Sequence, residues 1–243
     1  MKVAVITPTV DSAHLPKCLS SVAEQTYDDI VHYVVIDGSE YRDAQEKIAK
    51  YQHTRIITLE ENIGKGWYGH RVYAASPYLV NADVICFLDE DNWFKPNHIE
   101  TMVSTLNKSG VPWCYSLRDI HNKNGEFLSP DNCESLGKWN PVVSYNHIDT
   151  SCFAIKKDAL LGISHGWYGQ WGADRQFYAT LKHYRTDYEC TREHTVCYRL
   201  DGNEGSVKQD FFEEGNKIAK TKYPNGYPWE TWESTEEYIT LSW

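Results

Sequence analysis

Three acidic side chains follow directly on a short apolar segment in the first half of the chain. The apolar segment spans residues 84–88, and Asp89, Glu90 and Asp91 come immediately after it. A run of this length is enough for one buried strand and too short for a helix. Because burial of carboxylates carries a large desolvation cost, these side chains must emerge where water, a cation or a phosphate can meet them. Ligands of open α/β sheets bind at the carboxyl ends of the strands, so this stretch predicts a site for a metal ion and a diphosphate.

The chemistry available to such a site follows from the carboxylates. A hard divalent ion, Mn²⁺ or Mg²⁺, that is bound by one or two carboxylates keeps positions open for two phosphate oxygens. The ion would offset the charge that builds up on a departing nucleoside diphosphate. A short acidic cluster is by itself more often a solvated turn. Its position after a buried strand is what favours a ligand site here.

Strand-like and helix-like segments alternate along the first ninety or so residues. This alternation predicts an α/β fold with a parallel sheet and right-handed crossovers. The carboxyl ends of the strands then share one edge, where residues 7–9, which should break the first strand, meet residues 37–39 and 89–91. The expected strands are residues 2–6, 30–36, 54–59 and 84–88, and the expected helices are residues 16–26, 41–51 and 68–79.

The second half of the chain is less regular. Residues 122–125 (Asn-Lys-Asn-Gly) are a strong turn signal that predicts a hairpin and ends the parallel pattern. We expect one domain, with a nucleotide-binding half at 1–92 and an acceptor-binding half at 93–243 that ends in a packed tail or a lid. The expected elements of this half are helices at 96–107, 172–184 and 208–222 and strands at 111–117, 147–155 and 196–200.

Composition limits the classes of function. The 243 residues are 41% hydrophobic and 24% charged, which fits a soluble globular protein with a sizeable core. A net charge of −10 argues against a nucleic-acid partner. No apolar run is long enough for a membrane span, and no signal peptide is evident. Seven scattered cysteines without a C-x-x-C pair indicate reduced structural thiols in a cytoplasmic protein.

Five segments follow one another in the order and spacing found in family 2 glycosyltransferases, which the chain resembles over roughly residues 2–201. The resemblance implies a GT-A fold, with a Rossmann-like nucleotide-binding half, a mixed central sheet and a smaller acceptor-binding half. It also implies inverting, metal-dependent transfer of one sugar from a nucleoside diphosphate sugar to a hydroxyl of a glycan or another acceptor. The segments are residues 6–9 (ITPT), 34–39 (VVIDGS), 62–64 (NIG), 87–92 (FLDEDN) and 172–174 (GAD).

The resemblance places the donor-binding residues in the first half of the chain. Asp89 would reach the ribose or the donor sugar. Arg71 could pair with diphosphate oxygens through its guanidinium, although a plain surface charge is an equal alternative. The remaining donor-binding residues would be Thr7, Pro8 and Thr9 around the nucleobase, with Asp37 close by, and Gly64 and Lys65 in the loop that follows.

The resemblance assigns the metal and the catalytic base to separate carboxylates. Asp91 would bind Mn²⁺ or Mg²⁺, whereas Glu90 is expected to point to solvent. Asp174 would be the general base, which must lie within hydrogen-bond reach of the acceptor hydroxyl. The alternative for Asp174 is an ordinary acid stabilised by a helix N-terminus. Further candidates are Asp201, with His194 second, as another metal ligand, and Trp171 and Asp149 for the acceptor.

The chain departs from the family pattern at several positions. Ile36 stands where an acid commonly reads the base, so the pattern does not establish recognition of uracil. A UDP-sugar is the first candidate donor, and GDP- or dTDP-sugars remain alternatives. Ala173 replaces the acid before Asp174, and Asp201 stands where a histidine is common. Two other functions stay open. One is a non-catalytic carbohydrate- or nucleotide-binding protein that keeps the fold, and the other is a sugar-nucleotide nucleotidyltransferase.

Overall fold

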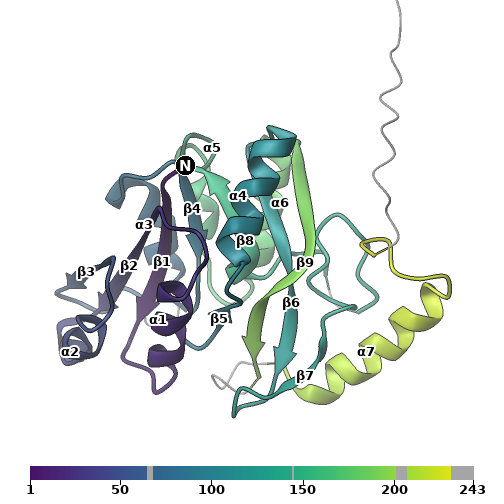
Figure 1. Cartoon of the computed structure of the whole chain (residues 1–243), viewed down its shortest axis with the longest axis horizontal. Coiled ribbons are helices and arrows are strands. Elements are labelled where there is room, and N and C mark those ends of the chain that lie inside the picture. Colours follow the sequence, from purple (N-terminus) through teal and green to yellow (C-terminus); the bar gives the residue numbers. More distant parts are fainter. Residues whose placement is uncertain (65–67, 144, 201–206, 231–243) are drawn as a thin grey trace, which may run out of the picture.

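The computed structural model describes residues 1–64, 68–143, 145–200 and 207–230. One mixed sheet runs through both halves of the chain, with strand order β3-β2-β1-β4-β8-β6-β9-β5 and with β7 paired to β6 (Figure 1). The strands are β1 (Val3–Thr9), β2 (Ile30–Asp37), β3 (Thr54–Leu59), β4 (Val84–Phe87), β5 (Trp93–Phe94), β6 (Trp113–His121), β7 (Phe127–Pro130), β8 (Phe153–Lys156) and β9 (Tyr188–Arg199).

The helices lie on both faces of this sheet. Helices α1 and α2 pack against each other, and α4 packs on β6 and β9. The helices α3, α5 and α6, together with the short η3, form a second contiguous group (Figure 1). They are α1 (Leu15–Ala23), α2 (Ala44–Ile48), α3 (His70–Leu79), α4 (His98–Ser109), α5 (Lys157–Leu161), α6 (Ala173–Tyr184) and α7 (Gln209–Lys222), with 3₁₀ turns η1 (Ser39–Tyr41), η2 (Thr150–Cys152) and η3 (Ser164–Trp167).

Strands β3, β2, β1 and β4 are mutually parallel, as the alternation of strands and helices predicts. Their residues are mostly buried, and β1 is buried along its whole length. The two-sided burial explains why β1 and β4 read as continuous apolar runs instead of alternating ones, whereas β3, at the edge of the sheet, has no fully buried residue. The parallel pattern ends at β4, whose other neighbour, β8, is antiparallel.

The prediction that residues 7–9 break the first strand is wrong, because β1 continues to Thr9. Thr7, Pro8 and Thr9 pair with Val34, Val35 and Ile36 of β2. The ladder between β1 and β4 has already ended at Ile6. The missing N–H of Pro8 therefore removes no ladder hydrogen bond on that side, which is how a proline can end a central strand.

Two strands of the second half also differ from the prediction. Residues 147–152 are not a strand, because Asp149 accepts a hydrogen bond from the Ser151 amide and caps the 3₁₀ turn η2. Strand β9 begins at Tyr188, well before the expected start at residue 196. Its first half contains Arg192 at a positive φ of 65° and only partly buried side chains, so it lacks a regular hydrophobic pattern.

Helix α4 follows its predicted pattern closely. The expected apolar face, Ile99, Met102, Val103 and Leu106, is buried against the sheet. The helix ends at Gly110, whose φ of 73° is the left-handed conformation that glycine adopts at helix ends. The hairpin expected at residues 122–125 is also present, since β6 and β7 pair antiparallel on either side of it.

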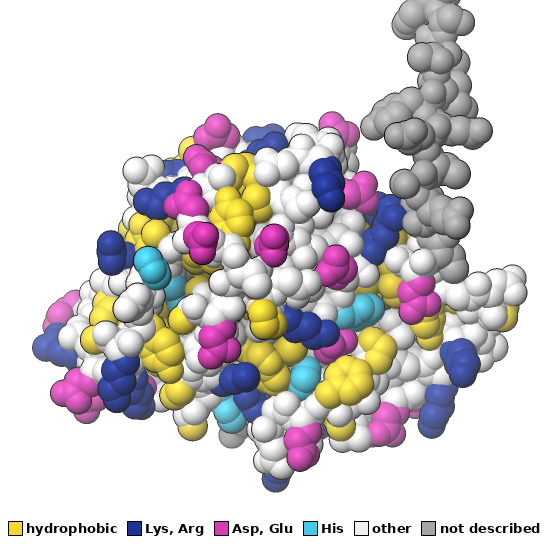
Figure 2. Space-filling model, viewed as in Figure 1, with side chains coloured by type: hydrophobic (Ala, Val, Ile, Leu, Met, Phe, Trp, Pro, Cys, Tyr) yellow, Lys and Arg dark blue, Asp and Glu magenta, His cyan; other side chains and the backbone are white. Residues whose placement is uncertain are grey.

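Surface and thiol features complete the description. On the face shown in Figure 2, basic and acidic side chains are interspersed. All seven cysteines fall within the described ranges, and each is buried and free of a disulfide. No helix in the described part of the chain has the length and apolar character that crossing a bilayer requires.

Candidate functional site

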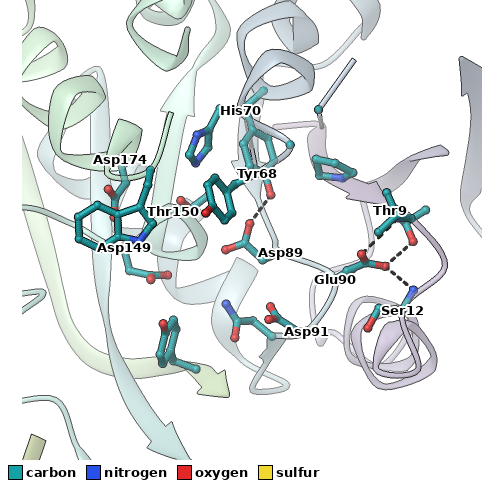
Figure 3. A pocket seen from close by; sticks show the side chains of 18 of the residues that line it. Thr9, Ser12, Tyr68, His70, Asp89, Glu90, Asp91, Asp149, Thr150 and Asp174 are labelled. Atoms are coloured by element: carbon teal, nitrogen blue, oxygen red, sulfur yellow. Dashed lines mark hydrogen bonds between the residues drawn. The ribbon is translucent and has the colours of Figure 1, made fainter. Parts of the chain in front are cut away.

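A cavity of about 660 Å³ opens at the carboxyl ends of β1, β2 and β4. Pro8 and Thr9 line it from β1, Asp37 from β2, and Asp89 and Asp91 from the segment after β4 (Figure 3). The strand ends that are far apart in sequence therefore meet at one place. The opposite wall comes from the second half of the chain, through Asp149, Thr150, Trp171, Asp174 and their neighbours.

Asp89 lies at the centre of the cavity, between the two walls (Figure 3). The Tyr73 hydroxyl of α3 donates a 2.7 Å hydrogen bond to its Oδ1 atom. Burial raises the pKa of Asp89 well above its usual value, and the neighbouring carboxylates of Asp149 and Asp91 raise it further. The cost of concentrating negative charge is thus largest where the sequence predicts a cation or a phosphate.

The environment of Asp91 is also unfavourable for a negative charge. Burial, followed by repulsion from Glu90, raises the pKa of Asp91 to about 6. The Arg199 guanidinium opposes this shift in the pKa of Asp91, but its Nε atom binds the backbone oxygen of Asp91 and not the carboxylate. Among the residues that the structure describes, no basic side chain forms an ion pair with the Asp91 carboxylate, which leaves it available to a cation.

Glu90 does not point to solvent, and that expectation is wrong. Its carboxylate accepts hydrogen bonds from the Thr9 hydroxyl (2.5 Å), the Val10 amide (3.2 Å) and the Ser12 amide (2.9 Å) (Figure 3). The Val10 and Ser12 amides lie outside β1 and α1, so they have no hydrogen-bond partner within a strand or a helix. Glu90 supplies that partner and thereby fixes the loop between β1 and α1. All three acids of the triplet line the cavity, and the carboxylate of the middle one is held by the loop between β1 and α1.

Asp37 lines the cavity and also supports the loop that follows β3. Its two oxygens accept hydrogen bonds from the amides of Ile63 (2.8 Å) and Gly64 (2.7 Å). A Cβ atom at Gly64 would lie 2.3 Å from Asp37 Oδ2, so only glycine allows this approach. Burial raises the pKa of Asp37, and the two amides oppose that shift.

Two predicted donor-binding residues are not among those that line the cavity. The Thr7 side chain is completely buried, and its hydroxyl lies 2.9 Å from His32 Nε2. Its position as a nucleobase-pocket residue is therefore wrong at the level of the side chain. Arg71 Nη1 donates to the Ile63 carbonyl at 3.2 Å, and its guanidinium lies over the Tyr168 ring. Lys65 falls outside the described residues.

Asp174 lies on the opposite wall, in the first turn of α6 (Figure 3). Trp171, which precedes this helix, also lines the cavity. Asp174 Oδ1 accepts a 2.8 Å hydrogen bond from the Arg175 amide, which is a local contact within the first turn. Its Oδ2 atom faces His147. Trp171 keeps 59% of its surface exposed, and the Arg175 guanidinium lies over its ring.

Asp149 lines the cavity but is committed to a buried ion cluster that the sequence analysis missed. Arg118 of β6 binds Asp149 (2.5 Å), Asp131 (2.8 Å) and Glu134 (2.7 Å) and stacks on the Tyr198 ring. Burial raises the pKa of Asp149, although Arg118 opposes the shift. The available signal was a pair of charged residues, Arg118 and Asp119, within a strand whose residues are all buried. His147 was missed as well.

The donor set fits a divalent cation that is shared with a ligand. Within the described ranges, no three His, Cys, Asp or Glu side chains form a ready metal site. Asp89 and Asp91 repel each other, so a cation at Asp91 would relieve that repulsion. A site of one or two carboxylates that uses phosphate oxygens for its remaining positions is how Mg²⁺ is usually held. Asp201 lies outside the described residues, and His194 is buried without lining the cavity.

Comparison with known proteins identifies relatives of one kind. The family model described as "Glycosyl transferase family 2" matches residues 4–161. The UDP-Glc:alpha-D-GlcNAc-diphosphoundecaprenol beta-1,3-glucosyltransferase WfgD of Escherichia coli is 26% identical over 154 residues, which are 62% of this chain and 56% of that protein. The hyaluronan synthase of Streptococcus pyogenes is 30% identical over 118 residues, 45% of this chain and 28% of that protein.

Solved structures extend the likeness beyond the family match. The crystal structure of Staphylococcus aureus TarS 1–349 in complex with UDP-GlcNAc superposes with a TM-score of 0.63 at 13% identity. It covers 93% of this chain and 67% of that chain. The complex of the same protein with UDP gives the same TM-score at 14% identity. The fold is therefore shared. The matched part of this chain spans 56% of the length of WfgD and a smaller share of other curated relatives.

Proposed function

Since the chain belongs to glycosyl transferase family 2 and has the GT-A fold, we propose that it moves a single sugar from a nucleoside diphosphate sugar to an acceptor hydroxyl. The transfer would invert the anomeric carbon and serve the synthesis of a glycan or polysaccharide. One observation carries the proposal. A single cavity joins the strand ends that carry Thr9, Asp37 and Asp91 to the wall that carries Asp174.

The nucleotide would occupy the end of the cavity that β1 and β2 form. Pro8 and Asp37 line this end, together with Asn62 of the 62–64 segment and with Tyr41, which the sequence analysis did not single out. A UDP-sugar is the donor that we propose. The names of two relatives support it, because WfgD is described as using UDP-Glc and TarS was crystallised with UDP and UDP-GlcNAc. Ile36 keeps GDP- and dTDP-sugars as alternatives.

The diphosphate would lie beside Asp89 and Asp91. Asp91 would hold Mn²⁺ or Mg²⁺, which would stabilise the negative charge of the departing nucleoside diphosphate. Asp89, which the Tyr73 hydroxyl orients, would face the ribose or the donor sugar. Glu90 would contribute indirectly, because it holds the loop of residues 9–12 against the nucleotide end.

Asp174 would act as the general base. Its carboxylate lies on the wall opposite the nucleotide end, with 21% of the side chain exposed, and its orientation is restrained by the Arg175 amide. An acceptor hydroxyl that approaches along this wall would give its proton to Asp174 as it attacks the anomeric carbon. Trp171, exposed beside Asp174, would stack against the apolar face of an acceptor sugar.

A two-part assay tests the function. Thermal unfolding is followed with UDP-, GDP- and dTDP-sugars, each with Mn²⁺ and with EDTA, because a ligand that binds the native state raises its stability. Release of the nucleoside diphosphate from the stabilising donor is then measured with and without simple glycan acceptors. We expect a UDP-sugar to stabilise the protein and to be consumed. Stabilisation without any turnover would identify a binding protein. Conversion of the donor, with added pyrophosphate, into a nucleoside triphosphate and a sugar 1-phosphate would identify a nucleotidyltransferase.

A further inference from the structure

His147 is a buried histidine that faces the proposed base from the cavity wall. Its Nε2 atom lies 3.8 Å from Asp174 Oδ2. Only 4% of the His147 side chain is exposed, yet the residue lines the cavity together with Asp174. The rest of the proposed mechanism gives this imidazole no role.

The second ring nitrogen fixes the proton on the ring. His147 Nδ1 lies 3.0 Å from the Tyr145 carbonyl oxygen. A carbonyl oxygen only accepts hydrogen bonds, so Nδ1 must carry the proton. A neutral His147 then presents the lone pair of Nε2 to Asp174, because the two nitrogens of a neutral imidazole have opposite roles.

Only one carboxylate oxygen of Asp174 faces His147. Oδ1 already accepts the Arg175 amide, so Oδ2 is the oxygen that faces His147. Other titratable groups also act on this wall, since Asp149 and His70 both interact electrostatically with Asp174. The Arg175 guanidinium lies over the rings of Tyr145 and Trp171, and its Nη2 atom is 3.7 Å from Glu134 Oε1. Oδ2 of Asp174 is therefore the atom that can exchange a proton with His147 Nε2.

We propose that His147 is a positioning residue that receives, through Asp174, the proton removed from the acceptor hydroxyl. The proposal rests on the proposed function. The acceptor oxygen forms its bond to the anomeric carbon while its proton moves to Asp174 Oδ2, and the nucleoside diphosphate leaves with the bonding electron pair. The proton then passes from Asp174 to His147 Nε2. This regenerates the carboxylate and leaves an imidazolium whose two N–H groups point to Asp174 and to the Tyr145 carbonyl.

In the structure, His147 and Asp174 are slightly too far apart for direct proton transfer. The 3.8 Å separation must shorten by about 1 Å to reach the length of a charge-assisted hydrogen bond. Contacts of this kind are commonly long before the substrate binds and tighten in the reactive complex. The acceptor, which must sit against the same wall, is the group that would bring the two side chains together.

Steady-state kinetics test the role of the imidazole. His147→Asn keeps an N–H group close to the Tyr145 carbonyl but has no atom that can accept a proton from Asp174, and His147→Gln places an amide nearer Asp174. We expect kcat to fall on the order of 10- to 100-fold in both variants, with the KM for the donor unchanged, because proton transfer is impaired and donor binding is not. The matched control is His165→Gln, an exposed histidine that does not line the cavity. A kcat within about twofold of wild type in His147→Asn would overturn the proposal.

Nitrogen-15 NMR of histidine-labelled protein provides a readout that does not need turnover. The His147 signals are assigned by their loss in His147→Asn. We expect the Nδ1–H tautomer, and a change of the Nε2 signal in Asp174→Asn. An Nε2–H tautomer, or an Nε2 signal that ignores Asp174→Asn, would overturn the pairing. If the wild type consumed no donor, the proposed function would fail, and the NMR result would show separately whether the pair exists.

Discussion

The Tyr73 hydroxyl of α3 donates a 2.7 Å hydrogen bond to Oδ1 of Asp89, the first acid after β4. Tyr73 is fully buried, and its ring packs edge-on against Phe87 at the end of that strand. The Tyr73 ring therefore packs in the core, while the hydroxyl of the same side chain orients a carboxylate in the cavity. This relationship makes the position of Asp89 a property of the core.

Replacement of Tyr73 by phenylalanine tests this connection. The ring packing stays, whereas the hydrogen bond that lowers the pKa of the buried Asp89 is lost, so that pKa rises further. We expect a loss of about 1–2 kcal/mol in the free energy of unfolding and weaker Mn²⁺-dependent donor binding. Urea denaturation and calorimetric titration measure the two effects. Tyr78→Phe, which removes the hydrogen bond from an exposed tyrosine of the same helix to the Leu161 carbonyl, is the control and should leave Mn²⁺-dependent donor binding unchanged.

Asp91→Asn should abolish the metal dependence of nucleotide binding. The variant keeps the size of the side chain but removes the charge that would hold Mn²⁺ against the diphosphate. We expect the thermal shift produced by UDP to be the same with Mn²⁺ and with EDTA. Asp187→Asn, an exposed acid outside the cavity, should behave as wild type. A full Mn²⁺-dependent shift in Asp91→Asn would refute the assignment of Asp91.

The same variant should be more stable than the wild type when metal is absent. The pKa of Asp91 is about 6 in the folded protein, above its ordinary value near 4. A raised carboxylate pKa means that ionisation of Asp91 opposes folding, so its unfavourable contribution grows as the pH rises from about 4 through about 6 and is complete above about 7. With EDTA, we expect Asp91→Asn to exceed the wild type by on the order of 1–3 kcal/mol at pH 8 and by much less at pH 5. Equal differences at the two pH values would contradict the assigned burial of the charge.

Asp174→Asn should separate binding from transfer. The asparagine oxygen can still accept from the Arg175 amide, so the start of α6 and the donor site should persist. Loss of the base should lower kcat by about 10²- to 10⁴-fold, with the donor-induced thermal shift preserved. Full activity in this variant would show that another group takes the acceptor proton, and Asp174 would then be a helix N-terminal acid only.

Much of the first half of the fold follows from local pattern. Strand β3 has the bounds that its residues predict, and the buried face of α4 is the one that its apolar spacing indicates. The convergence of the strand ends also follows, because parallel strands place their carboxyl ends on one edge. The early part of β9 could not be predicted. Its partly buried residues and the positive φ of Arg192 follow from pairing with β6, which is distant in sequence.

The sequence predicts which acidic residues line the candidate site, but it does not predict which residues they contact. Asp89, Asp91 and Asp174 all line the cavity. Arg118 engages three carboxylates from the chain beyond it, and no local pattern states which of them it meets. Side-chain direction is equally hidden: Thr7 and Thr9 lie on the same strand, yet only Thr9 lines the cavity. Such details depend on long-range packing.

Glu90 joins two parts of the cavity that would meet opposite ends of one donor. It lies between Asp89 and Asp91 in the chain, and its carboxylate accepts hydrogen bonds from Thr9 and Ser12 in the loop of residues 9–12. A change of backbone position on either side must therefore be transmitted to the other. The free energies of nucleobase recognition and of diphosphate recognition should then be non-additive, because Glu90 and its hydrogen bonds to the loop of residues 9–12 connect the two subsites. A uridine fragment and a diphosphate fragment would each be poor substitutes for the joined molecule, beyond the entropy that linking them saves.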